Sequence, residues 1–293
     1  MEMTVVIPTC NGADTIGRQL HALSQQESRR QWEILVVDNR STDRTVEVVR
    51  GWAGRDSKIR LISAEREQNL AYARNLAVQH TSAPFVAFVD DDDLVAPGWV
   101  SAMMSSLDLE PMVGSRFEYR LLNPPELLAG RAHVQSEELL TICDTPVVTG
   151  GGLGIHSEVW TTVGGNDESW SFSGEDLEFS LRATELGIRP TMAEDAVYHI
   201  AFRRGGRSAF RQARRAARAR VELAHRFGGG SRRGRWPTPP ARTWWWIATR
   251  SLPAAAGYHR ELWGRRVGDE VGHTEQTVRL KLGGGIGAVD RAG

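Results

Sequence analysis

The chain has 293 residues, 41% of them hydrophobic and 25% charged, with a formal net charge of zero. This composition excludes a disordered chain, and the presence of only two cysteines, Cys10 and Cys143, excludes a disulfide-rich scaffold. The start MEMTVVIPT is unlike a secretory leader, and the apolar residues 244–263 are interrupted by two arginines and a proline, so we expect a cytoplasmic chain that does not span a membrane.

The first half of the chain alternates between apolar runs and helical periodicities. We expect strands at 3–8, 33–38, 58–62 and 85–89, and helices at 41–52, at 70–80 and after Asp14, which can cap the helix containing Ile16, Leu20 and Leu23. The strand segments are continuously apolar, as in sheets that are covered on both faces. This pattern predicts an α/β, Rossmann-like fold with a mainly parallel central sheet flanked by helices.

The pattern loosens after Pro97 and then changes in composition. Helices are expected near 98–107 and 176–186, and a glycine turn at 150–154. We expect a catalytic domain at 1–202, with a nucleotide-binding half of about 1–95 and an acceptor half of about 96–202. Residues 203–293 then form a helical, Arg- and Trp-rich extension that includes a helix at 207–227.

Four consecutive aspartates, Asp90 to Asp93, follow the apolar run 85–89. Neighbouring carboxylates repel one another, so this arrangement is favourable when a cation lies beside them. Ligands of open α/β sheets bind at the carboxyl ends of the strands. We therefore expect the segments after the first, second and fourth strands to meet at one site.

Five segments then resemble, in order and approximate spacing, the motifs of family 2 glycosyltransferases with the GT-A fold. They are 4-TVVIPTCNG-12, 36-VVDNRSTDRT-45, 73-ARNLA-77, 88-FVDDDD-93 and 164-GGNDESWSFSGEDLEFSLRATELG-187. The resemblance covers roughly residues 3–200, about two thirds of the chain. It implies an inverting glycosyltransferase that moves a sugar from a nucleotide diphosphate donor to an acceptor hydroxyl, in the synthesis of a cell-surface polysaccharide, glycolipid or other glycoconjugate.

The resemblance assigns the aspartates to a DxD motif for a divalent cation, Mg²⁺ or Mn²⁺, that bridges the donor diphosphate. Asp92 is the expected direct ligand, together with Asp90, while Asp91 contacts the ribose and Asp93 caps the helix that begins near Pro97. Carboxylate oxygens suit both cations. The alternative is an acidic turn whose aspartates only cap a helix.

The resemblance also implies the residues that hold the donor nucleotide. Asp38 corresponds to the residue that hydrogen-bonds the base, and Pro8, Thr9 and Asn11 to the loop that holds base and ribose. Arg74 can bind a phosphate, because a guanidinium matches phosphate oxygens in a bidentate manner. The alternatives are ordinary turn residues for the loop positions and a solvated helix arginine for Arg74.

The ED pair at 175–176 supplies the expected base. The resemblance implies that Asp176 accepts the proton of the acceptor hydroxyl and that Glu175 positions the acceptor. The alternative is that both acids lie at a helix N-terminus only because the helix dipole stabilises negative charge there. His199 corresponds to a histidine of the family that completes the metal coordination shell. The alternative is that His199 is a hydrogen-bonded residue of the core. Trp170 is expected to stack on the acceptor sugar, or else to pack in the core.

The tail after residue 202 lies beyond the resemblance. Residues 203–250 contain fourteen arginines and one acid, Glu222, and 243-TWWWI-247 and Trp263 follow. Arginines beside tryptophans are typical of the surface of an anionic membrane, so the extension is expected to hold the protein peripherally at the inner face of the cell membrane, near a lipid-linked acceptor. The alternative is that these tryptophans pack the tail onto the catalytic domain.

Two other functions compete with this interpretation. A sugar nucleotidyltransferase also uses aspartate-bound Mg²⁺, but 8-PTCNGADTIGR-18 lacks its glycine-rich loop with arginine and lysine. A nucleic-acid-binding protein would explain the basic tail but leaves the ordered acidic motifs without a role, so no nucleic acid is expected as a partner. The expected donor is a UDP-, GDP- or dTDP-sugar. The sequence does not distinguish among these bases and does not identify the acceptor.

Overall fold

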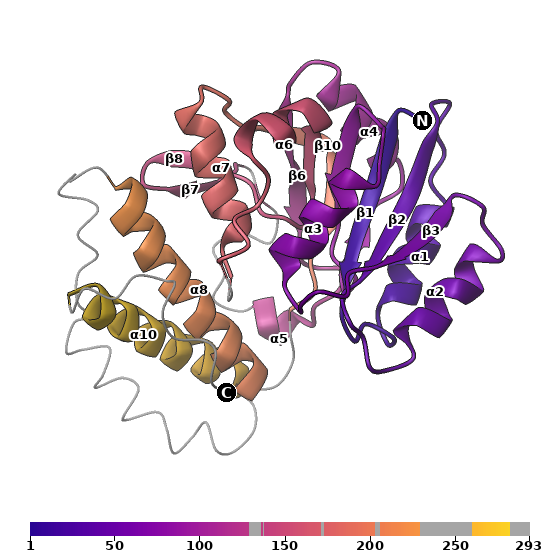
Figure 1. The fold of residues 1–293 in the computed structure, drawn as a ribbon. Coiled ribbons are helices and arrows are strands. Elements are labelled where there is room, and N and C mark those ends of the chain that lie inside the picture. The colour runs from indigo at the N-terminus through magenta and orange to yellow at the C-terminus, as the bar shows by residue number, and fades with distance from the viewer. Residues whose placement is uncertain (129–135, 137, 171–172, 203–205, 229–259, 282–293) are drawn as a thin grey trace. The chain divides into compact units, whose positions relative to one another are not determined.

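A computed structural model describes residues 1–128, 136, 138–170, 173–202, 206–228 and 260–281 (Figure 1). The chain divides into two compact units. The first consists of residues 1–141, 146–168 and 175–201, and the second of residues 142–145, 169–174 and 202–293.

An eight-stranded sheet forms the centre of the first unit. Its strand order is β3-β2-β1-β4-β9-β6-β10-β5, and the bounds are β1 Met3–Thr9, β2 Trp32–Asp38, β3 Ile59–Ser63, β4 Phe85–Phe88, β5 Leu94–Val95, β6 Met112–Glu118, β9 Leu153–His156 and β10 Thr191–His199. Strands β3, β2, β1 and β4 pair in parallel, as do β6 and β10. Strand β9 is antiparallel to both of its neighbours, and β5 is antiparallel to β10. The mainly parallel α/β sheet expected from the sequence is therefore confirmed.

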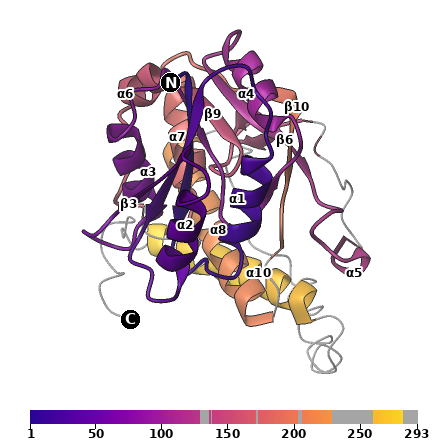
Figure 2. The same cartoon turned by 90° about the vertical axis from the view of Figure 1, so that its right-hand side faces the viewer.

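Helices cover both faces of this sheet. The bounds are α1 Ile16–Ser24, α2 Thr45–Ala53, α3 Leu70–Gln79, α4 Trp99–Leu107, α5 Pro125–Leu128, α6 Ser157–Val163 and α7 Glu175–Glu185. In Figure 2, α3 and α6 lie on one side of the sheet and α1 and α4 on the other. Alternate residues of the buried strands accordingly enter two cores: Val5 and Ile7 of β1 join Leu20 of α1, whereas Val6 joins Ala73 of α3 and Phe179 of α7. This accounts for the continuously apolar strand sequences.

Some local expectations were wrong. Helix α1 is preceded by Thr15, which makes no side-chain capping bond, and Asp14 is not its cap. Helix α2 begins at Thr45, because Asp43 accepts hydrogen bonds from the Thr45 N–H and hydroxyl and holds the preceding residues in a turn. Of the glycine turn expected at 150–154, residues 151 and 152 do form a turn, whereas Leu153 and Gly154 are strand residues of β9.

The second unit contains a helix pair. Helix α8 (Gly206–Phe227) and helix α10 (Arg260–Lys281) are joined by ion pairs between Arg214 and Glu275, with Nη2 to Oε1 at 2.7 Å, and between Arg220 and Asp269. The expected helix at 207–227 is confirmed. Residues 243–247, the tryptophan-rich segment, lie outside the described residues. Strands β7 (Leu140–Ile142) and β8 (Thr145–Val147) form a separate two-stranded sheet.

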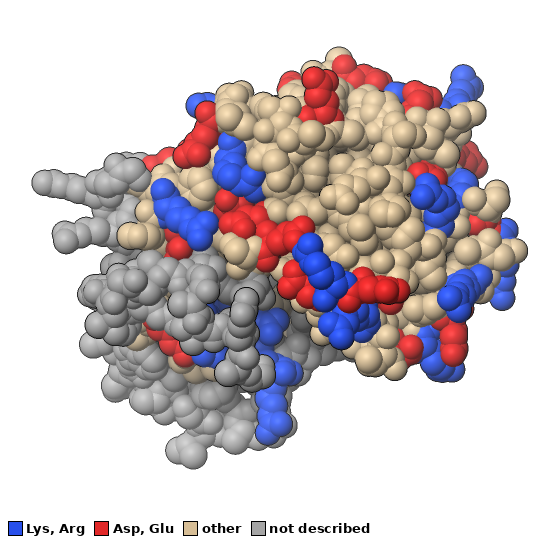
Figure 3. All heavy atoms as spheres, in the orientation of Figure 1, with Lys and Arg blue, Asp and Glu red and all other residues tan. Residues whose placement is uncertain are grey.

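Two surface properties bear on the possible partners of the chain. On the described surface of the first unit that faces the viewer in Figure 3, acidic and basic side chains are interspersed. Arg66 pairs with Glu67 and with Glu168. Among the described helices, none has the length and apolar character that a membrane crossing requires.

Candidate active site

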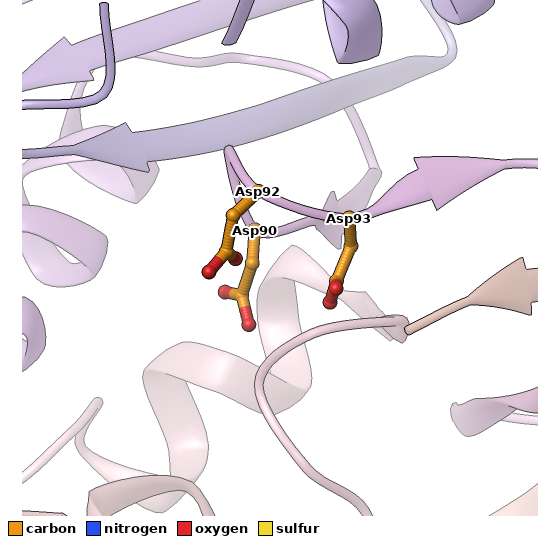
Figure 4. A group of neighbouring side chains, drawn as sticks. All are labelled: Asp90, Asp92 and Asp93. Carbon is orange, nitrogen blue, oxygen red and sulfur yellow. The ribbon is translucent and has the colours of Figure 1, made fainter. Parts of the chain in front are cut away.

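The aspartate cluster begins at Asp90, two residues after the end of β4. Asp90, Asp92 and Asp93 each offer a carboxylate oxygen, and these oxygens lie within 4.8 Å of one another (Figure 4). Asp90 and Asp92 are half-buried, and Asp93 is only 5% exposed. Hard, oxygen-preferring divalent cations fit such a donor set.

Asp93 is the buried member of this group. Its carboxylate accepts a hydrogen bond from the Ala201 N–H at 2.7 Å, and it bonds the hydroxyl of Tyr198. Burial, and then the charges of Asp90 and Asp92, raise the pKa of Asp93 well above its ordinary value. Added positive charge would relieve this repulsion, so the three carboxylates fit a cation on the evidence of their own electrostatics.

Asp93 does not cap the following helix, as was expected from the sequence. Helix α4 is preceded instead by Gly98, which adopts φ 81° and makes no side-chain capping bond. Asp93 points to the chain after β10 and ties the β4 end to that segment.

His199 lies at the end of β10, opposite Leu94 of β5. Its Nδ1 is 2.8 Å from a carboxylate oxygen of Glu118, the last residue of the neighbouring β6. His199 is not part of the three-carboxylate group. The metal-binding role expected for it from the sequence stays a prediction.

The loop after β1 contacts both the aspartate cluster and the loop after β2. The Thr9 hydroxyl donates to the Asp91 carboxylate. Asn11, at φ 58°, accepts hydrogen bonds at its Oδ1 from the backbone N–H groups of Thr42, at 2.8 Å, and of Asp43, at 3.3 Å. The three segments expected to meet at the strand ends therefore do so.

Asp38 and Pro8 belong to the strand ends themselves. Asp38 is 6% exposed and accepts a bond from the Ser41 N–H at 3.4 Å. Pro8 pairs with Val37 in the parallel register of β1 and β2. Burial first, and then the charges of Asp38 and Asp91, raise the pKa of the Cys10 thiol.

Arg74 joins the aspartate cluster to the ED pair. Its side chain is buried in α3, with Nη1 at 2.8 Å from Oε1 of Glu175 and Nη2 at 3.7 Å from Oδ1 of Asp90. These partners are 101 and 16 residues away along the chain. One guanidinium thus holds both halves of the candidate site together.

Glu175 is buried beside two other acids. Burial first, and then the charge of Asp176, raise its pKa to about 7, although Arg74 acts in the opposite direction. A side chain with this pKa changes charge near neutral pH. The surroundings of Glu175 are therefore sensitive to small changes in pH.

Glu175 gives a prediction for the pH dependence of stability. The pKa of Glu175 is 4.5 ordinarily and about 7 in the folded chain, so the fold favours the protonated side chain. Its contribution to the free energy of unfolding is therefore fully present below pH 4.5 and is lost as the pH rises to about 7. Glu175→Gln removes the titration, so over this window the free energy of unfolding of the unaltered chain should fall by up to roughly 3 kcal/mol more than that of the variant. Denaturant unfolding of both proteins at pH 5 and pH 8 measures the difference, and parallel pH profiles would contradict it.

Asp176 occupies the first turn of α7. Its Oδ2 accepts a hydrogen bond from the Gly150 N–H at 2.6 Å, and its Oδ1 accepts one from the Leu177 N–H at 2.8 Å. The carboxylate is half-buried, next to Arg74 and Glu175. It is thus oriented from two directions and stays reachable from solvent.

Trp170 belongs to the second unit and is 2% exposed. Its indole N–H donates to the carbonyl of Ser173, and the guanidinium carbon of Arg226 lies 4.9 Å from the centre of its ring. The acceptor contact expected from the sequence stays a prediction.

Sequence reasoning missed two supports of the site. Asn75, next to Arg74, donates from Nδ2 to the Asn166 carbonyl and to the Glu168 carboxylate, both at 2.9 Å, and accepts from the Asn166 N–H at 2.8 Å. Gly150 supplies the N–H that holds Asp176. Because Asn75 belongs to the ARN triplet that the sequence singled out, it could have been predicted as a support of the site. No local pattern marks Gly150 as a partner of Asp176, which is 26 positions away.

A cavity of about 280 Å³ adjoins this region within the first unit. Its lining includes Phe117, Tyr119, Glu138 and residues 147–149. Thr149 immediately precedes Gly150, whose N–H binds Asp176. The cavity therefore lies along the segment that orients the ED pair.

Comparisons with known proteins agree with this geometry. Residues 4–140 match the family model described as "Glycosyl transferase family 2". Glycosyltransferase AglE of Haloferax volcanii is 27% identical over 201 residues, covering 67% of this chain and 65% of AglE. The Escherichia coli UDP-Glc:alpha-D-GlcNAc-diphosphoundecaprenol beta-1,3-glucosyltransferase WfgD is 30% identical over 128 residues, covering 41% of this chain and 47% of WfgD.

A solved structure shares the fold. The mannosyltransferase PcManGT from Pyrobaculum calidifontis, in complex with GDP-Man and Mn²⁺, superposes with a TM-score of 0.65 at 21% identity, covering 94% of this chain and 87% of that one. The GT-A fold expected from the sequence is thereby confirmed. The chain spans about half to two thirds of the length of the two curated relatives named above.

Proposed function

We propose that this chain, whose residues 4–140 match the model of glycosyltransferase family 2, is a member of that family and transfers a sugar from a nucleotide diphosphate sugar to an acceptor hydroxyl with inversion at the anomeric carbon. The observation that carries the proposal is the position of Arg74. Its guanidinium lies 2.8 Å from Glu175 and 3.7 Å from Asp90, so a donor beside the aspartates is also beside Asp176. One half of the domain, about 1–95, then binds the nucleotide, and the other, about 96–202, binds the acceptor.

The donor nucleotide is assigned to the strand-end loops. Asp38 faces the base, the loop with Pro8, Thr9 and Asn11 holds base and ribose, and Asp91 holds the ribose. Thr9 and Asn11 fix these loops to their neighbours through the hydrogen bonds described above. The mannosyltransferase PcManGT binds GDP-Man, which supports a nucleotide sugar as donor.

Asp90 and Asp92 would hold a divalent cation, with His199 as a further candidate ligand. A Mg²⁺ or Mn²⁺ ion bound there supplies positive charge that stabilises the departing diphosphate. The fit rests on the convergence of carboxylate oxygens within 4.8 Å and on the charges of Asp90 and Asp92, which add to the effect of burial in raising the pKa of Asp93. The presence of Mn²⁺ in the PcManGT complex agrees with this assignment.

The transfer itself requires a base, which we assign to Asp176. As the acceptor oxygen attacks the anomeric carbon, its proton passes to the Asp176 carboxylate, and the bond from the anomeric carbon to the diphosphate oxygen breaks. The electron pair of that bond leaves with the nucleoside diphosphate. An ordinary carboxylate is a weak base, so proton transfer accompanies bond formation, when the attacking oxygen becomes acidic.

The acceptor is assigned to the other side of Asp176. Glu175 positions its hydroxyl, and the cavity lined by Phe117 and Tyr119 receives the rest of it. Aromatic faces with a few polar groups suit a sugar ring. The name of WfgD specifies an acceptor sugar linked through diphosphate to undecaprenol, which supports a lipid-linked acceptor in cell-surface glycoconjugate synthesis for this chain.

A lipid-linked acceptor calls for attachment to an anionic membrane, which we assign to α8. Arg207, Arg211 and Arg215 are exposed and four residues apart, so they lie along one face of the helix. Each basic residue near an anionic surface contributes about 1 kcal/mol, so changing all three to Gln should weaken cosedimentation with phosphatidylserine vesicles roughly 100-fold. The same change at the exposed residues Arg29, Arg50 and Arg55 of the first unit is the matched control; equal losses would reject α8 as the membrane-facing surface.

The experiment that tests the proposed function measures the products formed from UDP-, GDP- and dTDP-sugars with Mn²⁺. A glycosyltransferase releases the nucleoside diphosphate, whereas a sugar nucleotidyltransferase gives pyrophosphate chemistry and a nucleic-acid-binding protein gives neither. A thermal-shift screen of the same donors with and without Mn²⁺ identifies the base, because a ligand that binds the native state raises the melting temperature. Failure of every donor to bind or react would reject the proposal.

A further inference from the structure

Gly150 occupies a position in the site where two requirements meet. Its N–H donates to Oδ2 of Asp176 at 2.6 Å. A Cβ atom added at Gly150 would overlap the guanidinium of Arg74, whose Nη2, Cζ and Nη1 atoms are its nearest neighbours. The same residue therefore orients Asp176 and makes room for Arg74.

The backbone on either side of Gly150 is tied to the fold. The Ser180 hydroxyl of α7 accepts from the Val148 N–H at 3.1 Å and donates to the Val148 carbonyl at 3.2 Å. After Gly150, the Gly152 N–H donates to the Phe88 carbonyl of β4 at 2.8 Å. The N–H of Gly150 is thus held between α7, which carries Asp176, and β4, which ends at the aspartate cluster.

Arg74 has little freedom to move away from Gly150. Its side chain is 3% exposed and pairs with Glu175 at 2.8 Å. The next residue of the segment is equally close to the cluster, since a Cβ added at Gly151 would lie 2.8 Å from Oδ2 of Asp90. A side chain at position 150 must therefore displace either the guanidinium or the backbone that bonds Asp176.

We propose that Gly150 is a positioning residue for transfer: its N–H fixes the Asp176 carboxylate, and its lack of a side chain seats the Arg74 guanidinium between Glu175 and Asp90. This inference rests on the role proposed for Asp176. It goes further by assigning a catalytic requirement to a backbone group in the segment that leads into β9.

The test is Gly150→Ala, with Gly51→Ala in α2 as the matched control, because a Cβ at Gly51 meets no atom within 4 Å. Displacement of a reacting group by about 1 Å can cost about 100-fold in rate, so kcat should fall about 100-fold in Gly150→Ala. Any rise in the dissociation constant of the donor nucleotide should be at least about tenfold smaller than the fall in kcat, and Gly51→Ala should retain both values. A kcat like that of Gly51→Ala would overturn the proposal, as would a loss confined to donor affinity.

A thermal cycle tests the seating of Arg74 independently of any transfer assay. Arg74→Met keeps the length of the side chain up to the guanidinium but removes the atoms that a Cβ at position 150 would overlap. Gly150→Ala should lower the melting temperature by at least about 5 °C in the unaltered chain and by less than half as much in the Arg74→Met background. Equal losses in both backgrounds would overturn the seating of Arg74.

The two measurements separate the possible failures. If Gly150→Ala alone does not fold, the comparison of Gly150→Ala/Arg74→Met with Arg74→Met still decides whether the guanidinium is the obstacle: a folded double variant supports the proposal, and an unfolded one overturns it. Lack of transfer by the unaltered chain would reject the proposed function, while the thermal cycle would still give its own result.

Discussion

Asp176→Asn is expected to abolish sugar transfer while donor binding is retained. The amide has nearly the same shape as the carboxylate, and its oxygen can still accept the Gly150 N–H that Asp176 accepts at 2.6 Å. It cannot take up the proton of the acceptor hydroxyl, and loss of a positioned base costs typically 10²–10⁴-fold, so we expect kcat to fall by about 10³-fold. Steady-state kinetics measure this fall, and calorimetric titration with the donor nucleotide should give a dissociation constant within about threefold of the unaltered value.

A matched control for this change lies on the same helix. Glu185 is exposed at the other end of α7, and Glu185→Gln removes one negative charge without touching the site. Its kcat should stay within about twofold of the unaltered value, because an exposed substitution away from the site has little effect. Retention of more than a tenth of the activity in Asp176→Asn would contradict the assignment of the base.

Asp92→Ala is expected to remove the metal dependence of donor binding. Asp92 is half-buried and contributes one of the three convergent carboxylates, so its loss takes away both charge and an oxygen ligand. Loss of a residue that only supports a metal ligand already weakens metal affinity 10–100-fold, so loss of a direct ligand should weaken Mn²⁺-dependent donor binding by at least about 100-fold. Titration of the donor with and without Mn²⁺ measures this, and a chelator should reduce the affinity of the unaltered chain to the same level.

The control for charge is Asp195→Ala, at an exposed position in β10. It removes an aspartate without changing the three-carboxylate group and should leave donor affinity unchanged. If Asp92→Ala reduced kcat as Asp176→Asn does, with donor binding intact, the division of roles between the two aspartates would be wrong.

The nucleotide half of the fold follows from local sequence. Its strands are continuous apolar runs, and the helices between them carry a clear periodicity, so β1 to β4, α1 and α3 are found close to their expected bounds, while α2 begins four residues later than expected. The expectation that the loops after β1, β2 and β4 meet rests on a topological rule, and the contacts of Thr9 with Asp91 and of Asn11 with Thr42 agree with it.

The other half depends on pairings that local sequence does not encode. Strand β9 has four residues, two of which are Leu153 and Gly154, and it is a strand because β4 and β6 pair with it on either side. The contact between Arg74 and Glu175 joins residues 101 positions apart, and each alone resembles an ordinary charged helix residue. The local strength of a helix or strand signal says nothing about such partners.

The position of β9 also bears on what can be cut from this chain. The family match ends at residue 140, yet β9 lies at 153–156 and separates β4 from β6 in the sheet. A fragment that stopped at residue 140 would expose the unpaired backbone edges of β4 and β6, which are templates for aggregation. A shortened version therefore has to retain β9 if β4 and β6 are to keep their pairing partner. The matched region alone nevertheless contains every residue assigned to the nucleotide.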